Sequence, residues 1–275
     1  MPGDNSILTR WQTELETFHK NLSLLREEIT TEPVHDLRVA IKKLRSYLKL
    51  YIIICGKNDI EKHFQETRKL FSVLGKHRNV EIAKGLLTTP GSKNHPIQSL
   101  FYFLQLLQEQ IAPFCRQAID LYDTNGLEFL TGQLQQDLEN IDSTEISKKI
   151  KEEIESCVIA IKEDVKHFKK RSHRVRKRLK DIYYWSKIFE EQVYFNNAAL
   201  KVLDKTLEDL GNIQDYEILA TNLSYFRKTI LPQDGHESEL LKKIVAETKK
   251  TKESLLKKAQ KLTERLLLAD ATQQE

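Results

Sequence analysis

The chain has 275 residues, of which 40% are hydrophobic and 31% are charged, a composition that excludes an intrinsically disordered protein. Its formal net charge of +4 is too small to indicate a partner by itself. The longest purely apolar run, Leu50–Cys55, is far too short to cross a bilayer, and we expect neither a signal peptide nor a membrane partner. Three scattered cysteines without CxxC spacing predict no disulfide framework and a cytoplasmic location.

Apolar residues recur at spacings of three and four along nearly the whole chain, and no segment shows sustained alternation. The sequence therefore predicts an all-α protein with helices over residues 5–30, 33–55, 58–88, 96–122, 126–140, 143–166, 171–192, 196–232 and 237–268. Loops are expected over residues 88–96, 123–126 and 231–236. We expect interruptions near Gly75 and Gly211, because glycine tolerates the backbone of a helix break.

Two motifs occur twice, in the same order and at nearly the same separation. The first, His-x-x-Arg-x-x-x-Lys, begins at His35 and again at His173, 138 residues later. The second is a Leu-Gly pair with its glycine at Gly75 and at Gly211, 136 residues later. This order predicts a duplicated helical unit. One domain over residues 1–275 would then consist of two repeats, at about 5–140 and 143–270, packed as pseudo-symmetric bundles.

Positive charge is concentrated around both copies of the first motif. Residues 162–187 hold eleven Lys and Arg against three acidic residues, and residues 35–49 hold five against one. Together these segments carry a charge of +12, so the rest of the chain carries −8. A focused positive field of this kind is typical of a polyanion site.

The helical periodicity places the cations of each motif beside the apolar stripe instead of opposite to it. They would then face a groove between helices, where a lower dielectric strengthens charge-assisted hydrogen bonds. Arginine offers a planar fork to phosphate oxygens, lysine a mobile charge, and histidine a donor when protonated. The pattern therefore predicts a ligand-binding site for a phosphate polymer, made of His35, Arg38, Lys42, Arg45, Lys49, Lys169, His173, Arg176 and Lys180.

Other interpretations of these basic faces make different demands. A nucleic-acid-binding protein could use the same groove, but the faces carry few aromatic residues for base stacking. A phosphohydrolase would need metal-binding carboxylates that converge on the groove, and no acidic cluster supplies them. No P-loop, glycine-rich nucleotide motif or zinc motif is present, so we expect no cofactor, no metal and no catalytic activity.

Basic helix faces are also often merely solvated, and this is how we interpret the lysines of the last predicted helix. These are Lys242, Lys243, Lys249, Lys250, Lys257 and Lys258.

The repeated motifs resemble the two signatures of the CHAD family, a family of helical domains named for a recurring histidine. The matching segments are VHDLRVAIKKLRSYLKLY (residues 34–51) and SHRVRKRLKDIYYW (residues 172–185), each followed by a Leu-Gly turn. The resemblance covers essentially the whole chain. It implies two helical bundles around a basic central channel that binds inorganic polyphosphate, and association with polyphosphate granules. It also adds Lys177 and Tyr184 to the expected ligand-binding residues.

The chain departs from the family pattern at two positions. Asn79 stands where an Asp is usual after Arg78, so we expect a salt bridge to be weakened there. Tyr183 stands where an Arg is usual, which reduces the positive charge on that side.

Overall fold

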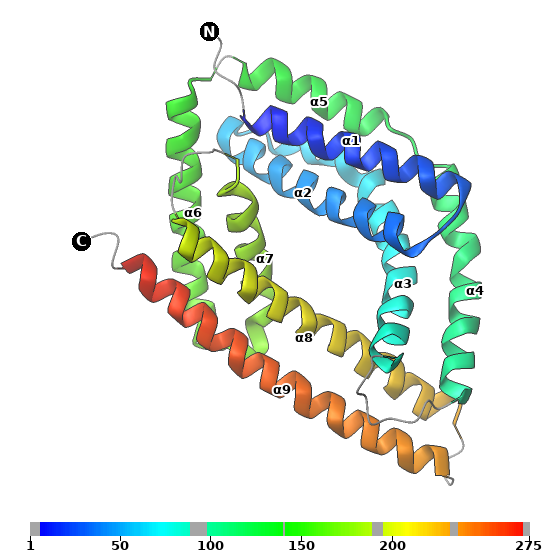
Figure 1. Cartoon of the computed structure of the whole chain (residues 1–275). Helices are drawn as coiled ribbons and strands as arrows, with labels where there is room; N and C mark the ends of the chain where they lie inside the picture. The colour runs from blue at the N-terminus through cyan, green and yellow to red at the C-terminus, as the bar shows by residue number, and fades with distance from the viewer. Residues whose placement is uncertain (1–5, 89–97, 140, 189–194, 232–235, 272–275) are drawn as a thin grey trace.

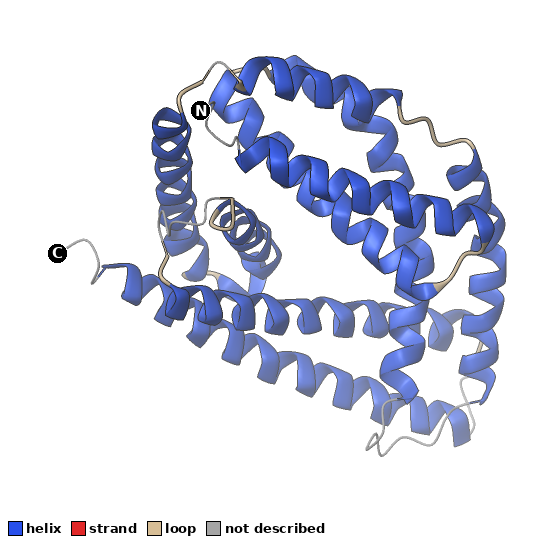
Figure 2. Ribbon diagram, turned by 45° about the horizontal axis from the view of Figure 1, so that its top comes forward, coloured by secondary structure: helices blue, strands red, loops and turns tan. Residues whose placement is uncertain are grey.

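The computed structural model describes residues 6–88, 98–139, 141–188, 195–231 and 236–271, and its regular structure within these ranges is entirely helical (Figures 1 and 2). The helices are α1 (Ser6–Glu27), α2 (Thr31–Cys55), the 3-10 helix η1 (Asn58–Phe64), α3 (Gln65–Thr88), α4 (Gln98–Asp120), α5 (Asn125–Leu138), α6 (Ser143–Val165), α7 (Phe168–Trp185), α8 (Asn197–Thr229) and α9 (His236–Ala271). The predicted all-α fold class is confirmed. Within the described ranges, none of these helices combines the length and the hydropathy that a bilayer span requires.

Local signals explain several helix ends. Gly56 adopts a left-handed conformation with φ of 71° after the last turn of α2, and its N–H bonds back to that turn at 2.8 Å. The side chain of Asp142 accepts a hydrogen bond from the Thr144 N–H at the start of α6. Asn196 caps α8 in the same way, through the N–H of Ala199. Side-chain acceptors at these positions satisfy N–H groups that have no partner within the helix.

Some predicted boundaries differ from the structure. The helix predicted over residues 58–88 divides into η1 and α3, because an apolar periodicity does not separate a short 3-10 turn from the α-helix that follows it. The helix predicted over 171–192 ends its regular part at Trp185. Of the predicted loops, 88–96 lies outside the described residues except for Thr88, and 231–236 lies outside them except for Leu231 and His236, which begins α9.

Four helices surround the centre of the molecule, and each of them has an outer partner. The inner helices α2, α3, α8 and α7 form a closed ring of contacts, in that order (Figure 1). The outer partners α1, α4, α9 and α6 pack against α2, α3, α8 and α7, respectively. The division into two repeats stays a prediction, but this arrangement brings both copies of each motif onto the inner ring.

Two hydrophobic clusters hold the ring together. The larger cluster joins α1, α2 and α5 to α6, α7 and the ends of α8 and α9, and its largest buried side chains include Trp11, Tyr51 and Trp185. The smaller cluster joins α3 and α4 to the other ends of α8 and α9. Because apolar surface is removed from water on the outer side of the ring, the inner side is left for polar groups.

The two basic helices α2 and α7 are fastened to each other by a polar contact inside the larger cluster. The indole nitrogen of Trp185 donates to the Ser46 carbonyl oxygen at 3.0 Å. The Ser46 hydroxyl donates to Asp181 at 2.8 Å, and Lys49 forms an ion pair with the same carboxylate at 3.1 Å. This contact fixes the position of one motif helix relative to the other.

We predict that Trp185→Ala lowers the free energy of unfolding by about 3–5 kcal/mol, the usual loss for removing a large buried aromatic side chain. Trp185 is 1% exposed. Chemical denaturation measures the loss, with Tyr102→Ala on the exposed side of α4 as the control, for which we expect a change of no more than about 0.5 kcal/mol. Equal losses for the two variants would contradict the role given to Trp185.

Candidate functional site

Arg38 of α2 is held in a niche formed by α3. Its guanidinium carbon lies 3.9 Å from the centre of the Phe71 ring. Its Nη1 donates a hydrogen bond to the Phe71 carbonyl oxygen. A Cβ added to Gly75 would be only 2.7 Å from the same nitrogen. The ring, the carbonyl and the missing side chain of the glycine together set the orientation of this guanidinium.

Arg176 of α7 lies in a related place against Gly211 of α8. A Cβ on Gly211 would be 3.7 Å from Nη2, an ordinary contact distance, so this niche is wider. No described residue accepts a hydrogen bond from the buried Nε of Arg176. The side chain adjoins a cavity of about 180 Å³ that is also lined by Ser172, His173, Leu210, Ile213, Gln214 and Glu217. Arg176 therefore has donor capacity left for a ligand.

Gly75 and Gly211 do not interrupt their helices, so the predicted breaks are wrong. Helix α3 is continuous from Gln65 to Thr88, and α8 is continuous from Asn197 to Thr229. Neither glycine has a positive φ; within the described residues, only Gly56 does. Both glycines instead omit a side chain at the point where an arginine of the adjacent inner helix packs.

Lys42 and Lys180 lie one turn after these arginines, and each is affected by charges of the other motif. Burial and the charges of Lys180 and Arg38 lower the pKa of Lys42 to about 7. Burial and the charges of Arg176 and Arg45 lower the pKa of Lys180 to about 8. Each lysine thus senses cations of the other motif, although the two motifs are 138 residues apart in the chain. The fold places both motifs at one site.

Phe71 is a contributor that the sequence analysis missed. Its ring lies beneath three cations of α2: besides Arg38, the Lys42 nitrogen is 5.8 Å and the Arg45 guanidinium carbon 6.0 Å from the ring centre. The available signal was its position one helical turn before Gly75, on the same face of the helix. The corresponding position before Gly211 is Leu207, so the second motif has no such ring.

Both motif histidines lie in this positive field. The pKa of His35 is lowered by burial and by the charges of Arg78 and Lys42. The pKa of His173 is lowered by burial and by the charges of Lys177 and Arg176, against a hydrogen bond with Gln214 that raises it. A bound anion would oppose these effects and favour the imidazolium form.

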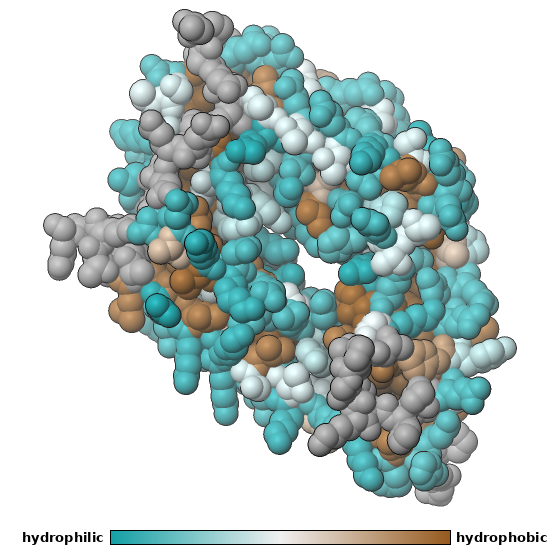
Figure 3. Space-filling model, in the orientation of Figure 1, coloured by the Kyte–Doolittle hydropathy of each residue, from teal (hydrophilic) through white to brown (hydrophobic). Residues whose placement is uncertain are grey.

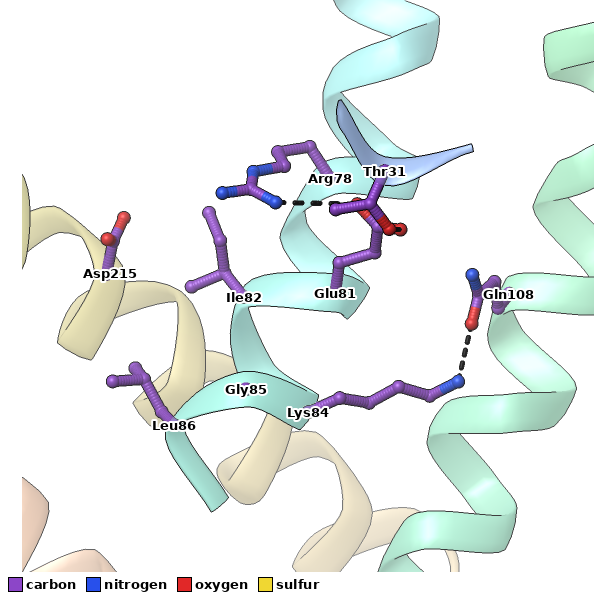
Figure 4. A pocket seen from close by; sticks show the side chains of 9 residues that line it. All are labelled: Thr31, Arg78, Glu81, Ile82, Lys84, Gly85, Leu86, Gln108 and Asp215. Atoms are coloured by element: carbon purple, nitrogen blue, oxygen red, sulfur yellow. Dashed lines mark hydrogen bonds and ion pairs between the residues drawn. The ribbon is translucent and has the colours of Figure 1, made fainter. Parts of the chain in front are cut away.

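Arg78 and Asp215 also belong to the site, although we did not predict them as ligand-binding residues. In Figure 4, Arg78 of α3 extends toward Asp215 of α8 beside a cavity of about 570 Å³. Burial raises the pKa of Asp215, against the opposing charges of Arg176 and Arg78. The signal was present in the repeated Leu-Gly motif, because these residues follow Gly75 by three and Gly211 by four positions.

The inner side of the ring is open at its centre. Figure 3 shows an opening through the middle of the molecule, with hydrophilic residues along much of its border. Within the described part of the chain, no three His, Cys, Asp or Glu side chains gather in a way that could hold a metal ion.

Two predicted residues lie away from this centre. Lys49 is engaged by Asp181 at 3.1 Å, in the contact between α2 and α7. Lys169 has a 79% exposed side chain and lies 3.8 Å from Glu253 of α9. The structure does not bring either one together with Lys42 and Lys180.

The two residues added by family resemblance lie on α7 itself. Lys177 is exposed and contributes to the field at His173. Tyr184 is half-buried, and burial raises its pKa to about 12 despite the nearby charge of Arg176. Both therefore border the cation cluster on the α7 side.

Comparison with known proteins identifies the family and agrees with the fold. The sequence model of the CHAD domain matches residues 9–224. The chain belongs to the CHAD family. The crystal structure of the CHAD domain from the plant Ricinus communis resembles it with a TM-score of 0.69 at 17% sequence identity, over 94% of this chain and 90% of that one. At this identity the likeness shows the fold alone. No curated protein sequence matches this one.

At the two positions where this CHAD domain departs from the family pattern, Asn79 and Tyr183, the structure shows other contacts. Arg78, which is followed by Asn79, lies 3.5 Å from Glu81 one turn further along α3. Tyr183 accepts a hydrogen bond from Lys187 at 2.5 Å, and the same lysine nitrogen lies 4.0 Å from the centre of its ring. The tyrosine therefore keeps one cation at its position.

Much of the positive charge counted on α7 is used for structure. The buried carboxylate of Asp164, at the end of α6, forms ion pairs with three arginines of α7. Arg171 lies at 3.1 Å, Arg174 at 3.6 Å, and Arg178 donates a close hydrogen bond. Buried charges require such partners. The net charge of this segment is therefore larger than the number of its basic side chains that are free to bind a ligand.

The lysines of α9 were expected to form a solvated face, and the six named ones are exposed, but Lys258 also has a structural contact. Lys258 forms an ion pair at 3.0 Å with Asp209 of α8, whose side chain is 2% exposed. Lys257 is exposed beside it. Lys258 therefore neutralises a buried acid, and only tertiary packing reveals this role.

We predict that Gly75→Ala stabilises the CHAD domain less than two matched substitutions do. Alanine within a helix is favoured over glycine by about 0.8–1 kcal/mol. Gly132→Ala in α5 meets no atom within 4 Å and Gly211→Ala meets one at 3.7 Å, so both should gain stability. At position 75 the added methyl group displaces the Arg38 guanidinium, and the cost of this displacement offsets the gain in stability. Equal gains in urea denaturation for all three variants would contradict the niche.

We also predict that Lys42→Met removes part of the pH dependence of stability. The unfolded lysine keeps its proton to its ordinary pKa of 10.5, whereas the folded one releases it near 7. The unfolded state thus binds more protons between these values, and the free energy of unfolding rises with pH across this window. Denaturation at pH 7 and pH 9 should show a smaller rise for Lys42→Met, and an unchanged rise for the exposed control Lys257→Met.

Proposed function

We propose that this CHAD domain binds inorganic polyphosphate among α2, α3, α7 and α8, without catalysing a reaction on it. The observation that carries the proposal is the convergence of four cations from both motifs: Arg38, Lys42, Arg176 and Lys180. Their mutual repulsion, together with burial, disfavours the charged forms. A polyanion bound among them would relieve this repulsion and stabilise the folded protein.

The types of the cationic groups support a phosphate polymer. Arg38 and Arg176 present planar guanidinium groups, which match phosphate oxygens in pairs, and the lysines add mobile charges between them. A polyphosphate chain carries an anionic phosphate at every unit and no bases, so it needs no aromatic stacking. The central opening in Figure 3 suits a slim, flexible chain. Location at polyphosphate granules in the cytoplasm would follow from such binding.

We propose binding instead of hydrolysis because of the acidic groups near the cations. Metal-assisted phosphate hydrolysis uses several carboxylates that converge on the reacting phosphate. The carboxylate that lies in the field of Arg176, Arg78 and Lys42 is Asp215. Glu81 lines the same cavity but is already engaged by Thr31 and Arg78, so a single carboxylate is left, which is too few for the two-metal arrangement.

Titration with labelled long-chain polyphosphate tests the proposal. Arg38→Ala and Arg176→Ala should each weaken binding by about 1–3 kcal/mol, the range for a hydrogen bond to a charged group. Lys257→Ala is the matched control, because this exposed lysine lies on α9 outside the ring and its charge is screened by salt. Lys258→Ala is unsuitable, since it leaves the buried Asp209 without its partner.

Circular dichroism should show unchanged helicity for all variants. If Lys257→Ala weakens binding as much as the arginine variants do, the polymer responds to diffuse charge and the proposed site is wrong. Competition by single-stranded RNA at the same salt concentration addresses the alternative function. RNA that displaces polyphosphate at a comparable phosphate concentration would favour a nucleic-acid-binding protein.

A further inference from the structure

The Asp215 carboxylate lies among basic side chains but forms no close ion pair with any of them within the described residues. Cations from three other helices act on it: His35 and Lys42 of α2, Arg78 of α3 and Arg176 of α7. Lys180 of α7 is affected by it in turn. Within the described residues, no donor forms a hydrogen bond or an ion pair with this carboxylate. Its oxygens therefore keep their acceptor capacity.

Asp215 lines the larger cavity, of about 570 Å³, which also borders Arg78 (Figure 4). The other carboxylate of this cavity is already engaged. Glu81 accepts a hydrogen bond from Thr31 and lies 3.5 Å from Arg78 and 3.8 Å from the buried His77. On the remaining wall, Lys84 donates to Gln108. Asp215 is thus the acidic group of the cavity that is left to meet a ligand.

A carboxylate in an anion site selects for the protonation state of the anion. A fully ionised phosphate oxygen placed against Asp215 is repelled by it, whereas a P–OH group donates a charge-assisted hydrogen bond to it. Such a group is found only at the ends of a linear polyphosphate. A terminal phosphate has a second ionisation near neutral pH, at about 6 for phosphate esters. An internal phosphate has no second proton to donate.

We propose that this cavity holds the end of the polyphosphate chain, with Asp215 accepting a hydrogen bond from the singly protonated terminal phosphate. This inference rests on the proposed function. Arg78 and Arg176 bind the other oxygens of that phosphate, and the internal phosphates continue along Lys42 and Lys180. The corresponding position of the first motif is the neutral Asn79, so the carboxylate gives the site one distinct end.

Hydrogen phosphate and sulfate provide a charge-matched test, because both are tetrahedral dianions and only hydrogen phosphate carries a proton. Each is used to displace labelled long-chain polyphosphate at pH 8. For the wild-type protein we expect phosphate to compete about tenfold better than sulfate, or more, since a half-buried acceptor without another partner disfavours a ligand that lacks the donor. Asp215→Asn should bring the ratio close to one, because the amide donates to sulfate as readily as to phosphate.

Two further variants show whether the carboxylate itself is responsible. Asp215→Glu keeps the acceptor and should keep the preference for phosphate. Glu208→Gln is the matched control, since it removes an exposed acid of α8 that pairs with Lys205 of the same helix and lines neither cavity. It should leave the ratio of phosphate to sulfate unchanged.

The polymer is tested with linear tripolyphosphate and cyclic trimetaphosphate, which have the same number of phosphates but differ in having ends. We expect the wild-type protein to bind the linear form more tightly than the cyclic one, and Asp215→Asn should reduce this ratio of affinities by about tenfold. If Asp215→Asn instead raises the affinity for both compounds equally, Asp215 acts only as a negative charge, and the proposed recognition of the chain end is wrong. Failure of long-chain polyphosphate to bind the wild-type protein would instead overturn the proposed function and this inference with it.

Discussion

Repulsion among half-buried cations is the constraint on which the arrangement of the inner helices depends. Lys42 and Lys180 come from opposite halves of the chain. The charge of Lys180 lowers the pKa of Lys42, and the charge of Arg45 lowers the pKa of Lys180, because water no longer screens these charges fully. Such a cluster does not form by itself. It is held by apolar burial on the outer side of the ring and by the Trp185–Ser46 contact between α2 and α7.

The fold separates the cations that stabilise it from those that remain available. Asp164 neutralises three arginines of α7, Asp181 engages Lys49, and Asp209 engages Lys258. These pairs lie between helices, where an unpaired buried charge would be destabilising. Arg38, Lys42, Arg176 and Lys180 form no ion pair within the described residues, and all four belong to the inner helices α2 and α7. On these two helices, a close carboxylate marks the cations that serve the structure.

The two arginine niches show how small residues serve a charged site. Arg38 is tightly held by Phe71 and Gly75, whereas Arg176 lies more loosely against Gly211 and keeps an unused donor. A guanidinium held in place loses less conformational entropy when it binds an anion. The looser side, which also contains Asp215, is the side on which a ligand can be discriminated.

The sequence by itself determined the helical fold class, the two motif pairs and the cluster of His35, Arg38, Lys42, Arg176 and Lys180, because helical periodicity and the spacing of charged residues are local properties. It assigned Gly75 and Gly211 to helix breaks, since an isolated glycine does not reveal which side chain from another helix needs its space. It also included Lys49 and left out Phe71 and Asp215. Only tertiary structure decided these roles, because whether a charge is paired, free or stacked depends on contacts between helices that lie far apart in the chain.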